Sequence, residues 1–100
     1  IGGHIPFELI YAWDPFEGIS QEAREHIIGV QCNMWSEYIK DMDTLEVMLL
    51  PRLAAMCEVQ WATDRRDSEE AAIRARMEVL RTFYDSCGWN CAPYYFDGRR

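Results

Sequence analysis

The sequence predicts an α/β fold with about two short strands and two long helices. Apolar runs at residues 7–11 and 29–34 are typical of short strands, and a helix signal lies between them. Two longer stretches, residues 44–62 and about 68–87, have the length and apolar spacing of helices. A strand, a short helix and a second strand in this order indicate a parallel α/β arrangement.

The predicted strand–helix–strand unit occupies the first third of the chain. The run Phe7–Tyr11 ends before Asp14-Pro15, because the residue preceding a proline avoids helical geometry. Ser20 is the predicted N-cap of a short helix that reaches about Ile27. Gly29 closes this helix, and the second strand covers roughly Gly29–Met34.

A longer, very apolar helix is predicted from Thr44 to Ala62. Asp43 and Glu46 are three residues apart, a spacing that resembles a capping box with Asp in place of Ser or Thr. Apolar residues cover nearly the whole circumference of this helix, so it must be covered on several sides. Pro51 is expected to kink the helix or to mark a restart.

The last predicted helix begins after Asp67 or Ser68 as its N-cap and ends at Gly88. The aromatic tail Trp89–Phe96 is expected to be extended and packed. The helix carries one apolar stripe at spacings of three and four residues, formed by Ile73, Met77, Leu80, Tyr84 and Cys87.

These elements do not add up to a complete domain. Two strands cannot form a stable parallel sheet alone, because parallel sheets are covered on both faces. The apolar helix also requires partners that 100 residues barely provide. Both observations indicate the end of a larger barrel, which would be predominantly helical when isolated and could pair with a second copy of itself.

Composition excludes several classes of function. The formal charge of −7, with 17 acidic and 10 basic residues, disfavours binding to nucleic acid. No membrane span, signal peptide, metal site or cofactor site is predicted. Cys32, Cys57 and Cys87 lie within apolar patterns, where cysteine behaves as a small hydrophobe. The sequence neither predicts nor excludes a disulfide between Cys87 and Cys91. His4 and His26 are expected to face solvent or to take part in packing.

The candidate site lies where the second apolar run ends. Trp35 and Glu37 are two residues apart, and residues two apart on a strand point to the same side. A flat indole beside an anionic hydrogen-bond acceptor suits a sugar, which has an apolar C–H face and a rim of hydroxyls. Core packing of Trp35 and a solvent-facing Glu37 are the alternatives.

Three segments together resemble the C-terminal end of glycoside hydrolase family 20, the β-N-acetylhexosaminidases. They are Gly29–Tyr38 (GVQCNMWSEY), Leu50–Ala55 (LPRLAA) and Glu58–Trp61 (EVQW), preceded by Tyr11–Pro15 (YAWDP). The resemblance covers roughly residues 7–95. It implies a (β/α)8 TIM barrel whose last strand ends at Trp35 to Glu37, and active sites of such barrels lie at the C-terminal ends of the strands.

The resemblance also implies roles for two residues. Trp35 would line the pocket of a terminal N-acetylglucosamine or N-acetylgalactosamine, and Glu37 would accept hydrogen bonds from its hydroxyls. Hydrolysis by enzymes of this family is substrate-assisted and retains the anomeric configuration. It uses an Asp-Glu pair, in which the aspartate orients the acetamido group and the glutamate protonates the leaving oxygen. No Asp-Glu dipeptide occurs in this chain. The expected partners are therefore glycans and the remainder of the barrel, and the chain alone is expected to be inactive, with no catalytic residue of its own.

Several other residues have a structural interpretation, and two other functions are compatible with the sequence. Arg52 and Glu58 are expected to form ion pairs that hold the helix to the barrel, and Trp61 is expected in the core. Asp14 is either an acid at the pocket edge or a turn residue before Pro15. The alternative functions are a non-enzymatic helical interaction module and another barrel glycosidase with an aromatic platform.

Overall fold

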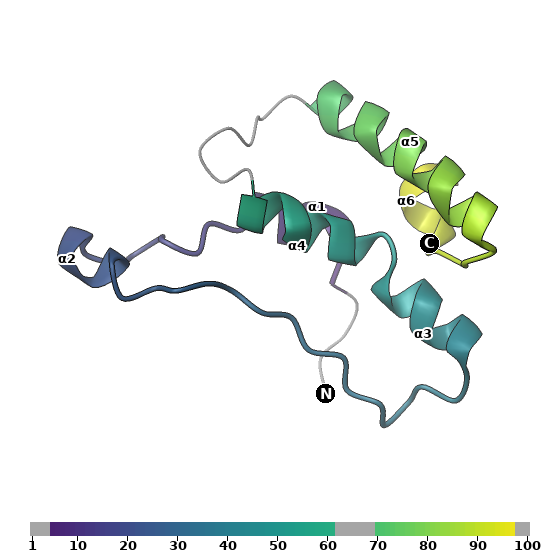
Figure 1. Ribbon diagram of the computed structural model, residues 1–100, viewed down its shortest axis with the longest axis horizontal. Helices are drawn as coiled ribbons and strands as arrows, with labels where there is room; N and C mark the ends of the chain where they lie inside the picture. Colours follow the sequence, from purple (N-terminus) through teal and green to yellow (C-terminus); the bar gives the residue numbers. More distant parts are fainter. Residues whose placement is uncertain (1–4, 62–69, 98–100) are drawn as a thin grey trace.

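The computed structural model describes residues 5–61 and 70–97, which form helices joined by turns and by one long extended connection (Figure 1). No strand occurs in these two ranges. The chain is therefore helical, as expected for a piece of a barrel, but both predicted strands are absent. The helices are α1 (Phe7–Ala12), α2 (Gln21–Arg24), α3 (Met42–Leu49), α4 (Arg52–Trp61), α5 (Glu70–Cys87) and α6 (Pro93–Asp97).

The first predicted strand is wrong: its residues form α1. Pro6 precedes the helix with extended dihedrals, and the backbone N–H of Leu9 donates to the Pro6 carbonyl at 3.2 Å. A helix satisfies its own backbone groups, whereas a strand here would find no partner among the described residues. The helical spacing also places Phe7 and Tyr11 on one face, where their rings stack with centroids 6.2 Å apart.

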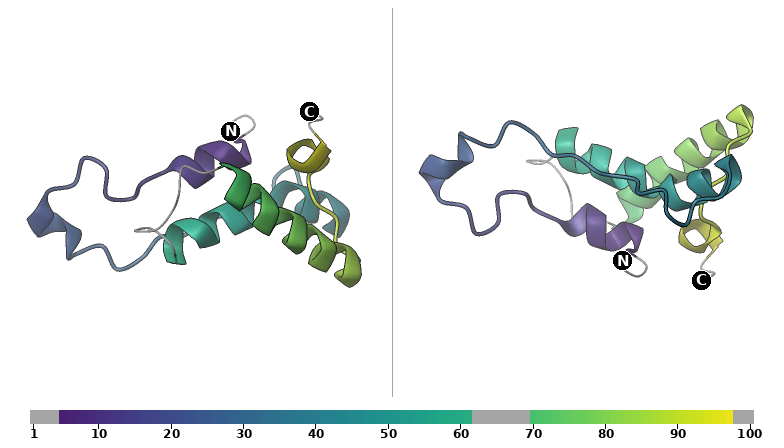
Figure 2. Two further views of the ribbon diagram at one scale, coloured as in Figure 1. Left: turned by 90° about the horizontal axis from the view of Figure 1, so that it is seen from above. Right: turned by 90° about the horizontal axis from the view of Figure 1, so that it is seen from below.

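The short helix after Ser20 is confirmed, although it is shorter than predicted. The Ser20 hydroxyl accepts a hydrogen bond from the backbone N–H of Ala23 at 3.2 Å, and α2 ends at Arg24 rather than near Ile27. Residues 27–36 then form neither a helix nor a paired strand within the described residues, and they make up a long connection (Figure 1). Figure 2 shows α2 at the tip of an excursion that projects away from the other helices.

The break at Pro51 is confirmed, and it separates α3 from α4. The predicted capping box is wrong by two residues, because Asp41 is the N-cap and its Oδ1 accepts from the backbone N–H of Thr44 at 2.8 Å. Glu46 is occupied elsewhere: its Oε2 accepts from both the backbone and the side-chain nitrogens of Asn90, at 2.9 and 3.0 Å. The C-terminal loop is thereby tied to α3.

The core forms where α1 and α4 meet α5 and α6. Phe7 is 1% exposed, and its ring centroid lies 4.2 Å from that of Tyr95. Burial of each such side chain contributes about 1.5–3 kcal/mol. The tail is therefore packed, as predicted, but it forms α6 instead of staying extended. The buried cluster consists of Phe7, Ala54, Ala55, Ile73, Met77 and Tyr95.

The apolar stripe of α5 is buried at three of its five members, and Leu80 is partly buried. Ile73, Met77 and Tyr84 are nearly inaccessible, whereas Cys87 is exposed. Burial raises the pKa of Tyr84 to about 12, with smaller contributions from the nearby Cys91 and Cys57 thiols. Gly88 ends the helix with a φ of 73°, a left-handed conformation that favours glycine. The predicted caps at residues 67 and 68 lie outside the described residues.

The N-cap of α3 predicts a measurable pH dependence. Hydrogen bonds from Thr44 hold the pKa of Asp41 below its ordinary value. A lowered pKa in the folded state means that the stabilisation is complete above the unfolded-state pKa and is lost as the pH falls through the folded-state pKa. The protection factor of the Thr44 amide, which is the intrinsic exchange rate at each pH divided by the observed rate, will therefore fall in acid.

The matched variant for this cap is Asp41→Asn, which keeps an acceptor oxygen but removes the titration. We expect the extra acid sensitivity of Thr44 exchange to disappear in Asp41→Asn and to persist in Asp85→Asn, a change at an exposed site on α5. An unchanged pH profile in Asp41→Asn would show that the cap does not depend on the carboxylate charge.

Candidate functional site

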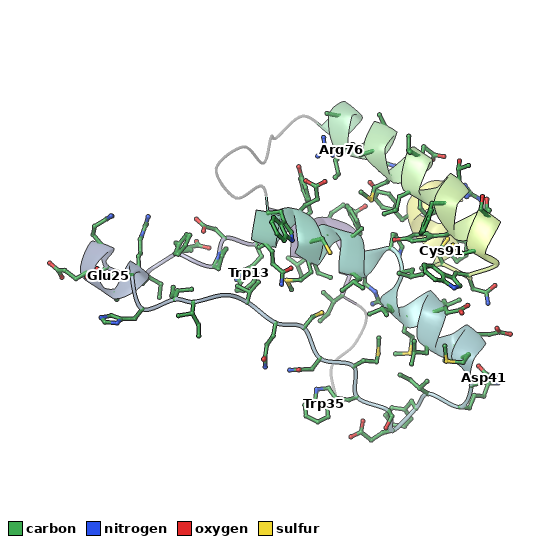
Figure 3. All side chains as sticks on the ribbon, viewed as in Figure 1. Trp13, Glu25, Trp35, Asp41, Arg76 and Cys91 are labelled. Atoms are coloured by element: carbon green, nitrogen blue, oxygen red, sulfur yellow. The ribbon has the colours of Figure 1, made fainter. Side chains whose placement is uncertain are left out.

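Trp35 lies near the end of the extended connection between α2 and α3, and its side chain is 72% exposed. Figure 3 shows the indole projecting away from the helices. The residue is therefore not part of the core of this chain, which was the alternative to a sugar platform. Its ring is available to a flat apolar partner.

Glu37 follows in a turn and is also exposed. The backbone N–H of Ile39 donates to the Ser36 carbonyl at 3.1 Å, and this bond closes the turn. The extended run ends at Ser36, so strand alternation does not continue through Glu37. Both candidate residues thus lie on one exposed segment, with the indole at the end of the extended part and the carboxylate at the start of the turn.

A cavity of about 380 Å³ lies next to this segment, and the sequence did not predict it. Cys32, Asn33 and Met34, which immediately precede Trp35, form one wall, whereas Trp35 and Glu37 do not line the cavity. Its surface is mostly apolar, so it does not resemble a site for a polar sugar. The other lining residues are Ile5, Ile10, Met48, Leu49, Arg52, Leu53 and Met56.

Arg52 has a structural role, but the expected ion pair does not form among the described residues. Its guanidinium donates to the backbone carbonyls of Ile5, at 3.2 Å, and of Met48. Its Nε is buried without a hydrogen-bond partner in the described part of the chain. Arg52 therefore links the start of α4 to the chain before α1 and to the end of α3.

Glu58 pairs within the chain, with Arg76 of α5. The Arg76 Nε and Nη2 atoms donate to the two carboxylate oxygens at 3.0 and 3.2 Å, and this bidentate bond raises the pKa of Arg76. The pair joins α4 to α5.

The prediction of a buried Trp61 is wrong, because this side chain is 84% exposed at the end of α4 while Ala55 and Val59 fill the core.

The remaining polar candidates have local roles. The Asp14 Oδ1 accepts from the backbone N–H of Phe16 at 2.9 Å, which is turn chemistry. Cys32, Cys57 and Cys87, which lie within apolar sequence patterns, are exposed in this chain. Cys87 and Cys91 are thiols, and no disulfide joins them.

In residues 5–61 and 70–97, no three His, Cys, Asp or Glu side chains lie close enough together to form a metal site. No helix in these ranges is long and apolar enough to span a membrane.

Comparison with known proteins places these residues in a family. Residues 2–64 match the family model described as glycosyl hydrolase family 20, catalytic domain, and the match includes both Trp35 and Glu37. The chain belongs to glycosyl hydrolase family 20. Membership implies a TIM-barrel parent, which is consistent with a piece that is helical and forms no strand in residues 5–61 and 70–97.

Individual relatives of this family-20 chain support the same assignment. A beta-N-acetylhexosaminidase of Cellulomonas fimi is 37% identical over 93 residues, which are 91% of this chain and 18% of that protein. A beta-hexosaminidase of Porphyromonas gingivalis is 32% identical over 61% of this chain and 8% of its own length. A chitooligosaccharidolytic beta-N-acetylglucosaminidase of Ostrinia furnacalis is 32% identical over 78% of this chain and 13% of its own length. The chain thus spans less than a fifth of each relative.

Proposed function

We propose that this chain is the C-terminal segment of the catalytic barrel of a β-N-acetylhexosaminidase, and that it supplies sugar-binding residues to that enzyme. The match of residues 2–64 to the family-20 catalytic domain carries the proposal, because it covers the tryptophan–serine–glutamate signature. The names of the relatives, two hexosaminidases and a beta-N-acetylglucosaminidase, support the same substrate class.

Trp35 would bind the apolar face of the terminal sugar. An aromatic ring and the C–H face of a hexose bury apolar area against each other, and stacking requires an accessible ring. The 72% exposure of the Trp35 side chain meets that requirement. In the complete barrel this ring would form one wall of the pocket.

Glu37 would hold the sugar hydroxyls. An ionised carboxylate is a pure acceptor with two oxygens, so it can bind two neighbouring hydroxyl donors. Hydrogen bonds to a charged acceptor are about twice as strong as neutral ones. The exposed position of Glu37 leaves these oxygens accessible to a ligand.

The chemical step would depend on residues that this chain lacks. In substrate-assisted hydrolysis the acetamido oxygen attacks the anomeric carbon, while a carboxylic acid protonates the departing oxygen. Without an Asp-Glu dipeptide, the chain contributes binding and orientation only. It should therefore be inactive when isolated.

The test uses aryl β-glycosides with the complete enzyme that contains this chain. We expect hydrolysis of the N-acetylglucosaminide and N-acetylgalactosaminide with retention of configuration, and no hydrolysis of the plain glucoside, which lacks the acetamido nucleophile. Equal rates on the glucoside would instead indicate another barrel glycosidase. Absence of any glycosidase activity would favour the helical interaction module.

A further inference from the structure

The loop between α5 and α6 is bonded to α3 at two points. In the first half of α3, the side-chain amide of Asn90 donates to the Asp43 Oδ1 and the Glu46 Oε2, both at 3.0 Å. The Asn90 backbone N–H donates to the same Glu46 oxygen at 2.9 Å. Beyond the end of α3, the buried Ala92 donates its backbone N–H to the Leu50 carbonyl at 2.8 Å (Figure 1). One short loop therefore holds both ends of this helix.

The loop is itself anchored on α5, so it can fix the position of another segment. The backbone N–H of Trp89 donates to the Tyr84 carbonyl at 2.9 Å, which closes the end of α5. The Trp89 ring centroid lies 5.8 Å from that of Phe83 and 6.2 Å from that of Tyr84. Asn90 therefore extends from a backbone that is held on both sides, by Trp89 and by Ala92.

A short stretch of chain separates α3 from the candidate sugar-binding carboxylate. Glu37 lies in the turn that is closed by the hydrogen bond from Ile39 to Ser36, and Asp41 then caps the helix. The four-residue step from Glu37 to Asp41 spans at most about 14 Å when fully stretched, and the turn shortens it. A shift of the first half of α3 is therefore passed on to Glu37.

We propose that Asn90 is a positioning residue of the sugar site, and this inference rests on the proposed function of Glu37. The hydrogen bonds of Asn90 hold the first half of α3, and thereby hold the Glu37 carboxylate where it meets the sugar hydroxyls. An asparagine suits this task, because its amide nitrogen has one N–H donor for each of the two carboxylates. Precise placement matters, since a shift of about 1 Å can cost about 100-fold in rate.

The experiment is a double-mutant cycle in the complete enzyme, with hydrolysis of an aryl N-acetylglucosaminide as the readout. Asn90→Ala should lower kcat/KM by roughly 3- to 30-fold, mainly through kcat, as expected for a residue that acts through Glu37. In the Glu37→Gln background the same change should cost almost nothing, because the carboxylate that it positions is already gone. Assays are run well below the melting temperature of every variant.

The control for lost stability is Phe7→Leu, which loosens the core between α1 and α6. Its fractional effect on kcat/KM should be the same in the wild-type and Glu37→Gln backgrounds. An equal loss from Asn90→Ala in both backgrounds would overturn the inference and leave the proposed function intact, because Asn90 would then support the fold alone. If Glu37→Gln has no effect by itself, both the inference and the proposed role of Glu37 fail.

A donor–acceptor exchange tests the hydrogen bonds themselves. Asn90→Asp places a third carboxylate against Asp43 and Glu46, and it should lower kcat at least as much as Asn90→Ala. Adding Glu46→Gln to Asn90→Asp should recover part of the loss, because the new amide then donates to the new carboxylate. A double variant that recovers no activity would contradict the proposed role of these bonds.

Discussion

Replacing Glu37 by glutamine in the complete enzyme will lower kcat/KM for N-acetylhexosaminides by about 10- to 100-fold. This range corresponds to the roughly 1.5–3 kcal/mol of a hydrogen bond to a charged group. Glutamine keeps the shape of the side chain but replaces one acceptor oxygen by a donor, which the sugar hydroxyls cannot satisfy as well. The loss should appear in kcat, since hydrogen bonds that strengthen in the transition state accelerate the reaction.

The matched control is Glu25→Gln. Glu25 is exposed and immediately follows α2, and Figure 3 shows it at the far end of the connection from Trp35. The same chemical change at this position should leave both constants unaltered. An unchanged kcat with a raised KM in Glu37→Gln would mean that Glu37 binds ground state and transition state equally, contrary to the proposed role.

Helices with strong local signals could be predicted from the sequence. Ser20, Pro51 and Gly88 act through their own backbone or side chain, and each performs its predicted task. The N-cap of α3 was misplaced because Asp41 and Asp43 both suit a cap by residue type. Asp43 and Glu46 instead accept hydrogen bonds from Asn90, 47 and 44 residues later in the chain, and sequence spacing does not reveal this contact.

Strands could not be predicted as reliably, because a strand requires a partner. The run Phe7–Tyr11 is apolar enough for a strand, but in the absence of a sheet it forms a helix and places Phe7 against Tyr95. Residues 29–34 form neither a helix nor a strand within the described part of the chain. The apolar pattern therefore predicted a strand in both runs, and neither run forms one among the described residues.

The candidate site shows the same difference between features set by local sequence and features set by tertiary contacts. Trp35 and Glu37 were found from a short motif, since neighbours in sequence need no tertiary information. The cavity beside them, and the contacts of Arg52 with two backbone carbonyls, arise only when α1, α3 and α4 meet. Trp61 shows that residue type alone can mislead. A tryptophan is expected in the core, but Trp61 is exposed on a face of α4 that lies away from the core.

Phe7→Ala will destabilise the folded chain more than any other single change considered, by about 3–5 kcal/mol. Phe7 is 1% exposed, and its ring contacts the ring of Tyr95 between α1 and α6. Truncation removes both the buried area and the aromatic contact, and leaves a cavity between segments that are far apart in the sequence. Urea denaturation followed by dichroism should show a lower midpoint.

Leu9→Ala, on the same helix, is the control because Leu9 is 62% exposed and loses little on truncation. Phe7→Leu should fall between the two, since it retains most of the apolar volume but not the ring. The order of midpoints expected is therefore Leu9→Ala above Phe7→Leu above Phe7→Ala. Equal midpoints for Phe7→Ala and Leu9→Ala would mean that α1 does not dock on the core in solution. The contact between Phe7 and Tyr95 would then contribute nothing to folding.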